Sequence, residues 1–284
     1  MKNRIIKTLF TIVLLIGIGQ TSFAGFPIGN GRWLLVPTYT RYAADGYWNK
    51  DGISSSFPNK GRYQSNYLGL YGGYGMGRDL DFVFNIPYVR QTYIENGVSQ
   101  EQLSTIADMT FGLSYFLNHF DYYKHLSITG SLIIPGYSDT LQTYLLPGFG
   151  STGFEAKLGL AGTNTNKLKD TYYDVEGGIR TYFNSGTPTV FFANATFGVP
   201  LDAEDWKISG TLNAVSASSP LTNNSINSKL NPFINRNFNY LRGTLAIGRR
   251  IDRNIALWAS IFRDFAGTSI GQGKGFSVFA VIKF

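Results

Sequence analysis

The chain ends on the stretch GFSVFAVIKF, residues 275–284, in the middle of an alternation of apolar side chains. One face of this predicted strand is apolar up to the last residue, and it consists of Phe276, Val278, Ala280, Ile282 and Phe284. In a soluble sheet this face would need a partner, whereas in a closed barrel surrounded by lipid it is the outer face of the closing strand. The stretch therefore predicts a transmembrane β-barrel. We also predict that these five residues form the signal that the barrel-assembly machinery of outer membranes recognises.

The first 24 residues, MKNRIIKTLFTIVLLIGIGQTSFA, are typical of a secretory signal peptide. Three basic residues are followed by an uncharged, mostly apolar run at 8–19, and small residues stand at Ser22 and Ala24. The apolar run is shorter than the ~20 residues that a membrane-spanning helix needs. We therefore expect cleavage after Ala24 and a single domain, an outer-membrane β-barrel over residues 25–284.

The composition excludes several classes of function. The chain has no cysteine and only two histidines, which excludes disulfide scaffolds, thiol chemistry and Cys- or His-rich metal sites, so we expect no metal and no cofactor. The net charge of +7 includes three basic residues of the signal peptide, and the remaining bias is too weak to indicate a nucleic-acid partner. The 33 Gly, 18 Tyr and 22 Phe, together with a mean hydropathy near zero, are typical of strands with one lipid face and one water face.

Alternating segments separated by turn residues predict a closed antiparallel barrel of about twelve strands, with both termini on the periplasmic side. The predicted strands are 31–43, 62–76, 79–93, 104–118, 124–137, 151–162, 171–184, 187–199, 204–217, 237–250, 253–266 and 273–284. The first and the eleventh strand do not show the alternation and are placed by position only. Longer connections are expected on the outer side, at 44–61, 94–103, 138–150, 218–236 and 267–272. An aromatic girdle is expected near the periplasmic strand ends, at Trp33, Tyr122, Tyr123, Tyr172, Tyr173, Trp206 and Phe284.

Charged residues recur on the predicted inward faces. Glu155 and Lys157 share the inner face of the sixth strand, and Asp174, Glu176 and Arg180 share that of the seventh. Further inward charges are predicted on other strands at Asp81, Asp108, Lys207 and Arg242. Isolated charges inside a barrel are costly and paired ones are tolerated, so we expect a network of opposite charges in the lumen. Such a network either fills and rigidifies the lumen or sets selectivity at a constriction.

Three prolines fall inside predicted strands, at Pro37, Pro87 and Pro135. A closed barrel has no edge strand, so each proline removes a ladder hydrogen bond or marks a bulge. Pro87 interrupts an otherwise clear alternation and is the candidate for a lateral gap through which an apolar substrate leaves the lumen. The alternative is that all three prolines mark bulges near strand ends.

Several stretches together resemble a known family. They are NYLGLYGGYGMGRDLDFVFNIPYV, ADMTFGLSYFL, SLIIPGYSD, GFGSTGFEAKLGLAG and the closing GFSVFAVIKF. In order and spacing they are similar to the phenol-degradation meta-pathway (MetA-like) family of outer-membrane barrels, which is related in function to FadL-type channels. The resemblance implies passive uptake of small apolar or aromatic substrates by a barrel embedded in membrane lipid. Only GFPIGNGR precedes the first strand, so a long N-terminal hatch is not expected and any plug should come from loops.

Two other classes of function remain open. A barrel enzyme acting on lipid would need a nucleophile and a base at the outer rim, whereas His119 and His125 share one predicted periplasmic turn. No catalytic residue is therefore predicted, and we expect the protein not to be an enzyme. A structural or surface barrel without transport is the other alternative, although the longest predicted outer loop, 218–236, is modest for an adhesin.

Overall fold

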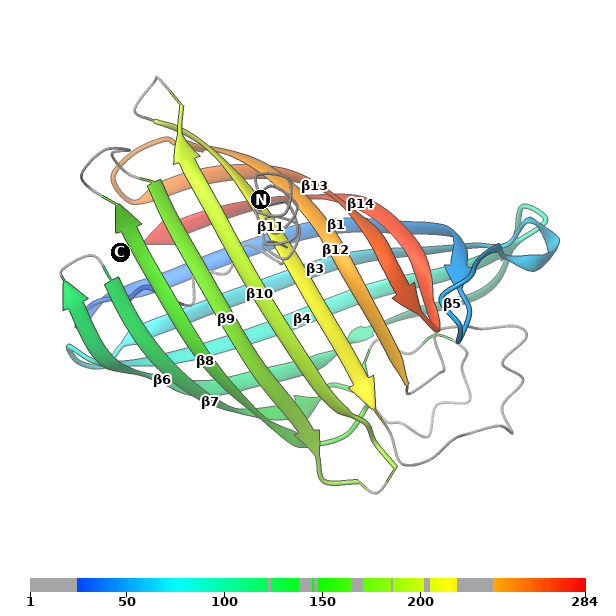
Figure 1. Cartoon of the computed structure of the whole chain (residues 1–284), viewed down its shortest axis with the longest axis horizontal. Coiled ribbons are helices and arrows are strands. Elements are labelled where there is room, and N and C mark those ends of the chain that lie inside the picture. The colour runs from blue at the N-terminus through cyan, green and yellow to red at the C-terminus, as the bar shows by residue number, and fades with distance from the viewer. Residues whose placement is uncertain are drawn as a thin grey trace, which may run out of the picture.

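The computed structural model describes residues 25–121, 124–137, 145, 148–164, 171–184, 186–201, 205–218 and 237–284. The predicted signal peptide lies outside these residues. The described chain forms a closed barrel of 12 antiparallel strands (Figure 1), as the sequence predicts. Among the described residues, no helix is long and apolar enough to cross a membrane.

The barrel strands start within about two residues of the predicted positions in most cases. They are β1 (Trp33–Trp48), β3 (Arg62–Gly75), β4 (Leu80–Glu95), β6 (Asp108–Asp121), β7 (Lys124–Pro135), β8 (Gly153–Asn164), β9 (Thr171–Tyr182), β10 (Thr189–Pro200), β11 (Trp206–Ser218), β12 (Phe238–Arg250), β13 (Ile255–Thr268) and β14 (Ile270–Lys283). Each pairs with the next in this order, and β14 pairs with β1 to close the barrel.

The last residue takes part in the closure. The amide of Trp33 donates to the carbonyl of Phe284 at 2.7 Å, and the amide of Phe284 donates to the carbonyl of Trp33 at 3.1 Å. The side chain of Phe284 is 61% exposed on the outside, and Phe276 and Val278 are exposed on the same face. The predicted outer face of the closing strand is therefore present. Its role as an assembly signal stays a prediction.

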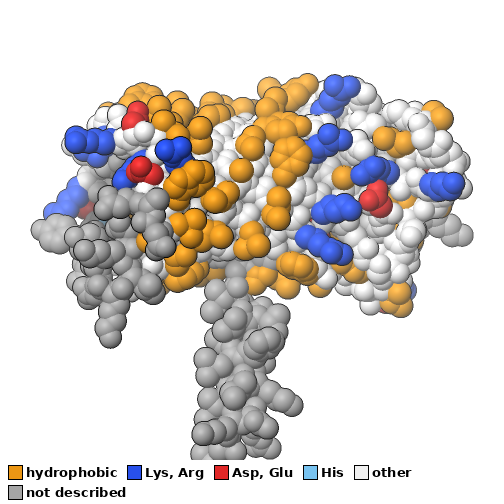
Figure 2. Space-filling model, turned by 90° about the horizontal axis from the view of Figure 1, so that it is seen from above, with side chains coloured by type: hydrophobic (Ala, Val, Ile, Leu, Met, Phe, Trp, Pro, Cys, Tyr) orange, Lys and Arg blue, Asp and Glu red, His pale blue; other side chains and the backbone are white. Residues whose placement is uncertain are grey.

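An apolar belt covers the outside of the barrel. Figure 2 shows apolar side chains gathered over a broad band of one face. Exposed apolar residues come from strands all around the barrel and include Leu68, Leu113, Leu132, Phe154, Leu158, Val175, Phe191, Phe197, Leu245, Leu257, Ile261, Phe265, Phe276 and Val278. Apolar side chains face outward because successive residues of a strand point to opposite faces. A closed barrel with such a belt satisfies its backbone internally and places the chain in the outer membrane.

Three predicted connections differ from the structure. The expected loop 94–103 is a hairpin, because β4 continues to Glu95 and turns at Asn96 and Gly97 into β5 (Val98–Ile106). Both turn residues have positive φ, which suits a two-residue hairpin. The expected loop 267–272 is reduced to Ser269, which also has positive φ. The connection 44–61 contains β2 (Ser54–Ser56), paired with β1, and a single 3-10 turn, η1 (Pro58–Lys60).

Candidate functional site

The lumen contains a cavity of about 460 Å³ lined by inward-facing side chains of most strands. Its walls combine aromatic rings with charged groups. The aromatic residues are Tyr67, Tyr71, Phe149, Tyr182, Phe192, Phe238, Tyr240, Phe262 and Phe279, and the charged residues are Asp108, Glu155, Lys157, Glu176, Arg180 and Arg242. Six of the nine predicted lumen charges therefore line this cavity.

Four of the predicted charges form one ion-pair network on β8 and β9. Glu155 and Arg180 are direct cross-strand partners, and the guanidinium donates to the carboxylate. The ammonium of Lys157 lies 3.8 Å from the carboxylate of Glu155 and 3.6 Å from that of Glu176. Glu155 is only 4% exposed, so its two cations compensate for the loss of solvation. The predicted network of opposite charges is present for these four residues.

Two amides extend the network across β10 and β11. The strand register places Glu176 opposite Asn194, and Asn194 opposite Asn213. The side-chain amide of Asn194 donates a hydrogen bond to the carboxylate of Glu176 at 2.5 Å. The side-chain amide of Asn213 in turn donates to the side-chain oxygen of Asn194 at 2.6 Å. One wall of the lumen thus carries a continuous chain of polar contacts over four strands, which makes it rigid and hydrophilic.

A second ion pair lies on β12 and β13, apart from that network. The guanidinium of Arg242 donates to the carboxylate of Asp264 at 2.7 and 3.3 Å, and the amide of Gly273 donates to the same carboxylate at 3.1 Å. The guanidinium also lies over three aromatic rings, those of Tyr42, Tyr240 and Phe262, at 4.7 to 5.5 Å from their centroids. Sequence reasoning missed Asp264, although Ser260 and Asp264 mark the polar side of their strand.

The remaining four predicted charges lie elsewhere. Asp81 accepts a hydrogen bond from the amide of Ile28, and Asp108 accepts one from the amide of Phe149, both at 2.9 Å. Asp174 is 1% exposed and lies close to Gly25, where an added Cβ would stand 2.8 Å from its Oδ1. The ammonium of Lys207 lies 5.7 Å from the centroid of the Tyr172 ring.

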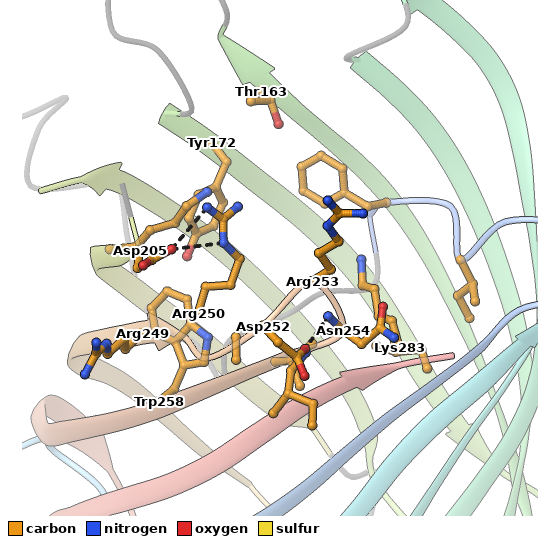
Figure 3. Close-up of a pocket in the computed structure, with 18 of the residues that line it drawn as sticks. Thr163, Tyr172, Asp205, Arg249, Arg250, Asp252, Arg253, Asn254, Trp258 and Lys283 are labelled. Carbon is orange, nitrogen blue, oxygen red and sulfur yellow. Dashed lines mark hydrogen bonds and ion pairs between the residues drawn. The ribbon is translucent and has the colours of Figure 1, made fainter. Parts of the chain in front are cut away.

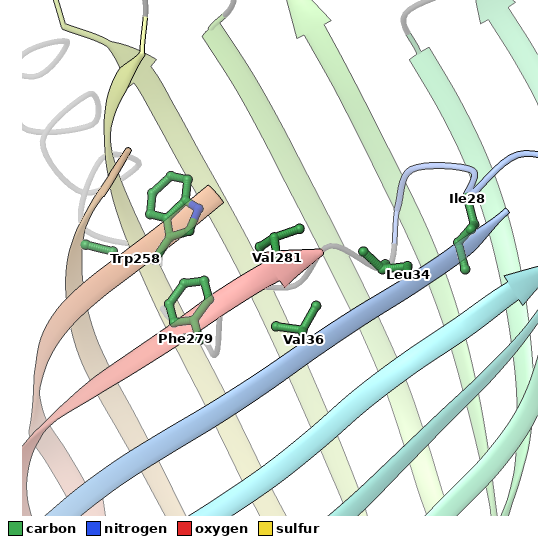
Figure 4. Close-up of a cluster of buried hydrophobic side chains, with 7 residues drawn as sticks. Ile28, Leu34, Val36, Trp258, Phe279 and Val281 are labelled. Carbon is green, nitrogen blue, oxygen red and sulfur yellow. The ribbon is translucent and has the colours of Figure 1, made fainter. Parts of the chain in front are cut away.

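An apolar cluster covers part of the inner wall toward the end of the barrel that carries the C-terminus (Figure 4). It consists of Ile28, Leu34, Val36, Ala246, Trp258, Phe279 and Val281. The rings of Trp258 and Phe279 stack with centroids 5.9 Å apart. Val36 and Phe279 also line the lumen cavity, whereas Leu34, Trp258 and Val281 line a second cavity. The apolar cluster therefore lies between the two cavities.

The second cavity, the end pocket, has a volume of about 310 Å³ and lies among the turns at the C-terminal end of the barrel (Figure 3). Its rim is polar: Arg250 pairs with Asp205 at 3.2 Å, and Arg253 and Lys283 lie nearby. Asp252 accepts hydrogen bonds from the amides that follow it in the turn. Tyr172 lines this pocket from inside the barrel, so its predicted place in the outer girdle is wrong.

The segment before the first strand lies inside this mouth of the barrel. Phe26, Pro27 and Ile28 line the end pocket, and the ring of Phe26 lies edge-on to that of His125, 6.1 Å away. The amide of Gly31 donates to the carbonyl of Gly75 at 2.8 Å, which holds the segment against β3. The short segment before the first strand therefore lines the mouth of the barrel, and the expectation that any plug would come from loops stays a prediction.

Pro87 lies on β4, opposite Gly69 of β3, in a pairing that continues unbroken on both sides. On the other side of β4, pairing with β6 ends at Asn85 and pairing with β5 begins at Tyr88. The interruption is a one-residue bulge at Ala107, whose amide donates to the carbonyl of Pro87 at 2.9 Å. The ring of Pro87 is buried on the lumen side. Lateral exit beside Pro87 stays a prediction.

The fold defines the chain as an outer-membrane β-barrel. No family model matches the sequence, and no curated protein matches it significantly. The COG4313 outer membrane channel from Pseudomonas putida F1 superposes with a TM-score of 0.70 at 15% identity, over 94% of this chain and 100% of the other. The NanC porin also has this fold, with a TM-score of 0.51 at 7% identity, over 87% of this chain and 98% of the other. So does the beta domain of the Bordetella autotransporter BrkA, with a TM-score of 0.50 at 11% identity, over 88% of this chain and 99% of the other. At these identities the likeness concerns the fold, which serves proteins of different function.

Proposed function

We propose that the protein is a channel for passive uptake of small hydrophobic or aromatic molecules across the outer membrane. The observation that carries the proposal is the apolar cluster on the inner wall. In a water-filled porin the inner faces are polar, whereas here stacked rings and aliphatic side chains lie between the lumen cavity and the end pocket. An apolar molecule can move along such a surface without losing contact with apolar groups.

The lumen cavity supports the same proposal through its size and lining. A volume of about 460 Å³ falls in the range of small-molecule sites, and its many aromatic rings suit flat apolar ligands. The resemblance to the phenol-degradation meta-pathway family supports aromatic compounds as the substrate class. The ion pairs on β8 and β9 would then act as a hydrophilic wall opposite the apolar one. A selectivity role for this wall is part of the proposal.

We further propose that apolar substrate leaves the lumen sideways into the bilayer beside Pro87. The support is the interruption of the strand pairing between Asn85 and Tyr88, which coincides with the proline of β4. The hydrogen bond from Ala107 to Pro87 bridges this bulge. Opening would therefore require that contact to break.

Uptake by strains with and without the protein tests the proposal. We expect the strain with the protein to take up toluene, phenol and hexanoate faster, with no difference for glucose. A Phe279→Asn variant, which places a polar group in the apolar cluster, should lower uptake of the apolar compounds. The matched control Ser277→Asn changes an inward residue on the same strand outside the cluster. Equal uptake by both strains, or equal rates for Phe279→Asn and the parent, would contradict the proposal.

A further inference from the structure

A group of cations faces outward on neighbouring strands at the end of the barrel opposite the termini. The outward basic patch consists of Arg41 on β1, Arg90 on β4, Arg263 on β13 and Lys274 on β14, all exposed. The register places Arg263 directly opposite Lys274, and it places both Arg41 and Arg90 opposite Asn66 of the strand between them. Figure 2 shows Lys and Arg side chains gathered toward the end where the β4–β5 hairpin lies.

The patch has few acidic partners. Asp45 pairs with Arg62 at 3.0 Å and lies 4.0 Å from Lys274, while Arg90 lies 3.3 Å from the amide of Gln102. Within the described part of the chain, Arg41 and Arg263 form no ion pair with a carboxylate. Like charges directly opposite each other on paired strands are destabilising. An anion bound between Arg263 and Lys274 would therefore relieve the repulsion between these two cations.

The position of the patch indicates which anion this is. The neighbouring outward residues toward the middle of the barrel belong to the apolar belt: Ile261 on β13 is opposite Phe276 on β14, and both are exposed, as are Val278 on β14 and Leu68 on β3. The cations therefore stand at the level where the lipid head groups meet the acyl chains. They lie at the end that carries the longer connections, which faces outside in barrels of this type. The lipid there is the glycolipid of the outer leaflet.

We propose that the outward basic patch binds the phosphate groups of lipopolysaccharide, with its acyl chains packed on the apolar side chains beside the patch. Guanidinium groups bind phosphate oxygens through two parallel hydrogen bonds, and clustered cations attract a multiply charged head group. Arg41, Arg263 and Lys274 hold the phosphate, and Ile261, Phe276 and Val278 contact the acyl chains. The site lies on the outside of the barrel and is independent of what passes through the lumen.

Binding of lipopolysaccharide to the purified, folded full-length barrel in a zwitterionic detergent tests the proposal. We expect the triple variant Arg41→Gln/Arg263→Gln/Lys274→Gln to retain about tenfold less lipopolysaccharide than the parent, because each exposed contact contributes a few-fold. The matched control Arg78→Gln/Arg249→Gln/Arg253→Gln removes the same charge at the opposite end and should bind like the parent. A heat-dependent shift in electrophoretic mobility confirms that each variant is folded.

Two further measurements make the result decisive. Dephosphorylated lipopolysaccharide should bind the parent as weakly as the triple variant binds the intact lipid, and added salt should weaken binding of the intact lipid. Equal retention by parent and triple variant, or equal binding of the intact and dephosphorylated lipids, would overturn the proposal. A loss of binding in the control variant equal to that in the triple variant would overturn it as well, because it would indicate attraction by net charge alone.

Discussion

The backbone amide of Ile28 donates a hydrogen bond to the carboxylate of Asp81 at 2.9 Å, and this contact holds the segment before the first strand inside the mouth of the barrel. Asp81 is 2% exposed, so the amide provides a partner for a carboxylate that water hardly reaches. The side chain of Ile28 meanwhile belongs to the apolar cluster. Ile28 therefore anchors this segment in two ways, through its backbone to the buried carboxylate of Asp81 and through its side chain to the apolar cluster.

Replacing Asp81 should loosen this segment. Asp81→Ala removes the acceptor of a buried, charge-assisted hydrogen bond, and we expect a loss of about 1–3 kcal/mol in the free energy of unfolding. The released mouth should also raise single-channel conductance in planar bilayers. Asp51→Asn, on an exposed outer turn, serves as the control and should change neither quantity. An unchanged conductance in Asp81→Ala would show that the segment does not narrow the pore.

The ion-pair network should respond strongly to the loss of one member. Glu155→Ala leaves Arg180 without its carboxylate and leaves Lys157 with Glu176 alone. Because Arg180 is partly exposed, we expect a loss of about 3 kcal/mol in the free energy of unfolding, the low end for buried pairs. The loss of one negative charge from the lumen wall should also shift the reversal potential toward anion selectivity. Asp205→Asn breaks an exposed pair at the barrel end and should cost less than about 1 kcal/mol. Similar losses in the two variants, measured by urea unfolding, would contradict this account.

The closing strand should be sensitive at its last residue. Deleting Phe284 removes the paired hydrogen bonds with Trp33 and an exposed aromatic side chain, so outer-membrane levels should fall severalfold. The variant Phe284→Tyr keeps the backbone contacts and the ring, and it should assemble like the parent. Quantitative blotting of outer-membrane fractions measures both. Parental levels of the deletion variant would refute a role for Phe284 in assembly.

The proposed lateral route depends on Pro87. Pro87→Val restores a backbone amide and should stabilise the local pairing, so uptake of apolar compounds should slow about severalfold while the barrel becomes slightly more stable. Pro37→Val on β1 is the control for introducing valine at a strand proline. Uptake at the parental rate in Pro87→Val would exclude the lateral route and leave exit through the end pocket.

Most of the architecture could be predicted from the sequence because outward and inward residues alternate along most strands. The exceptions have a physical cause. On β13 the inward face carries Trp258 and Phe262 while the outward face carries Leu257 and Ile261, so the two faces do not differ in polarity. Where the inward residues are apolar as well, the sequence lacks the alternation of polar and apolar residues that identifies a barrel strand.

The pairing of charges could be predicted only in part. Sequence alternation assigns Glu155, Arg180 and Arg242 to the lumen, but the partner of each depends on register. The bulge between Leu241 and Arg242 shifts the pairing so that Arg242 stands opposite Asp264. The sequence also does not reveal the tight turns at Gly97 and Ser269, because the strands continue there through mostly polar stretches without a clear alternation.

Flux through the purified protein distinguishes a channel for apolar molecules from a barrel that does not transport them. The barrel is inserted into liposomes without any energy source, and entry of phenol, toluene and glucose is measured against protein-free liposomes and against the Phe279→Asn variant. We predict protein-dependent entry of the two aromatic compounds, lower entry through the variant, and little entry of glucose. Aromatic compounds entering no faster with the protein than without it would contradict the proposed channel.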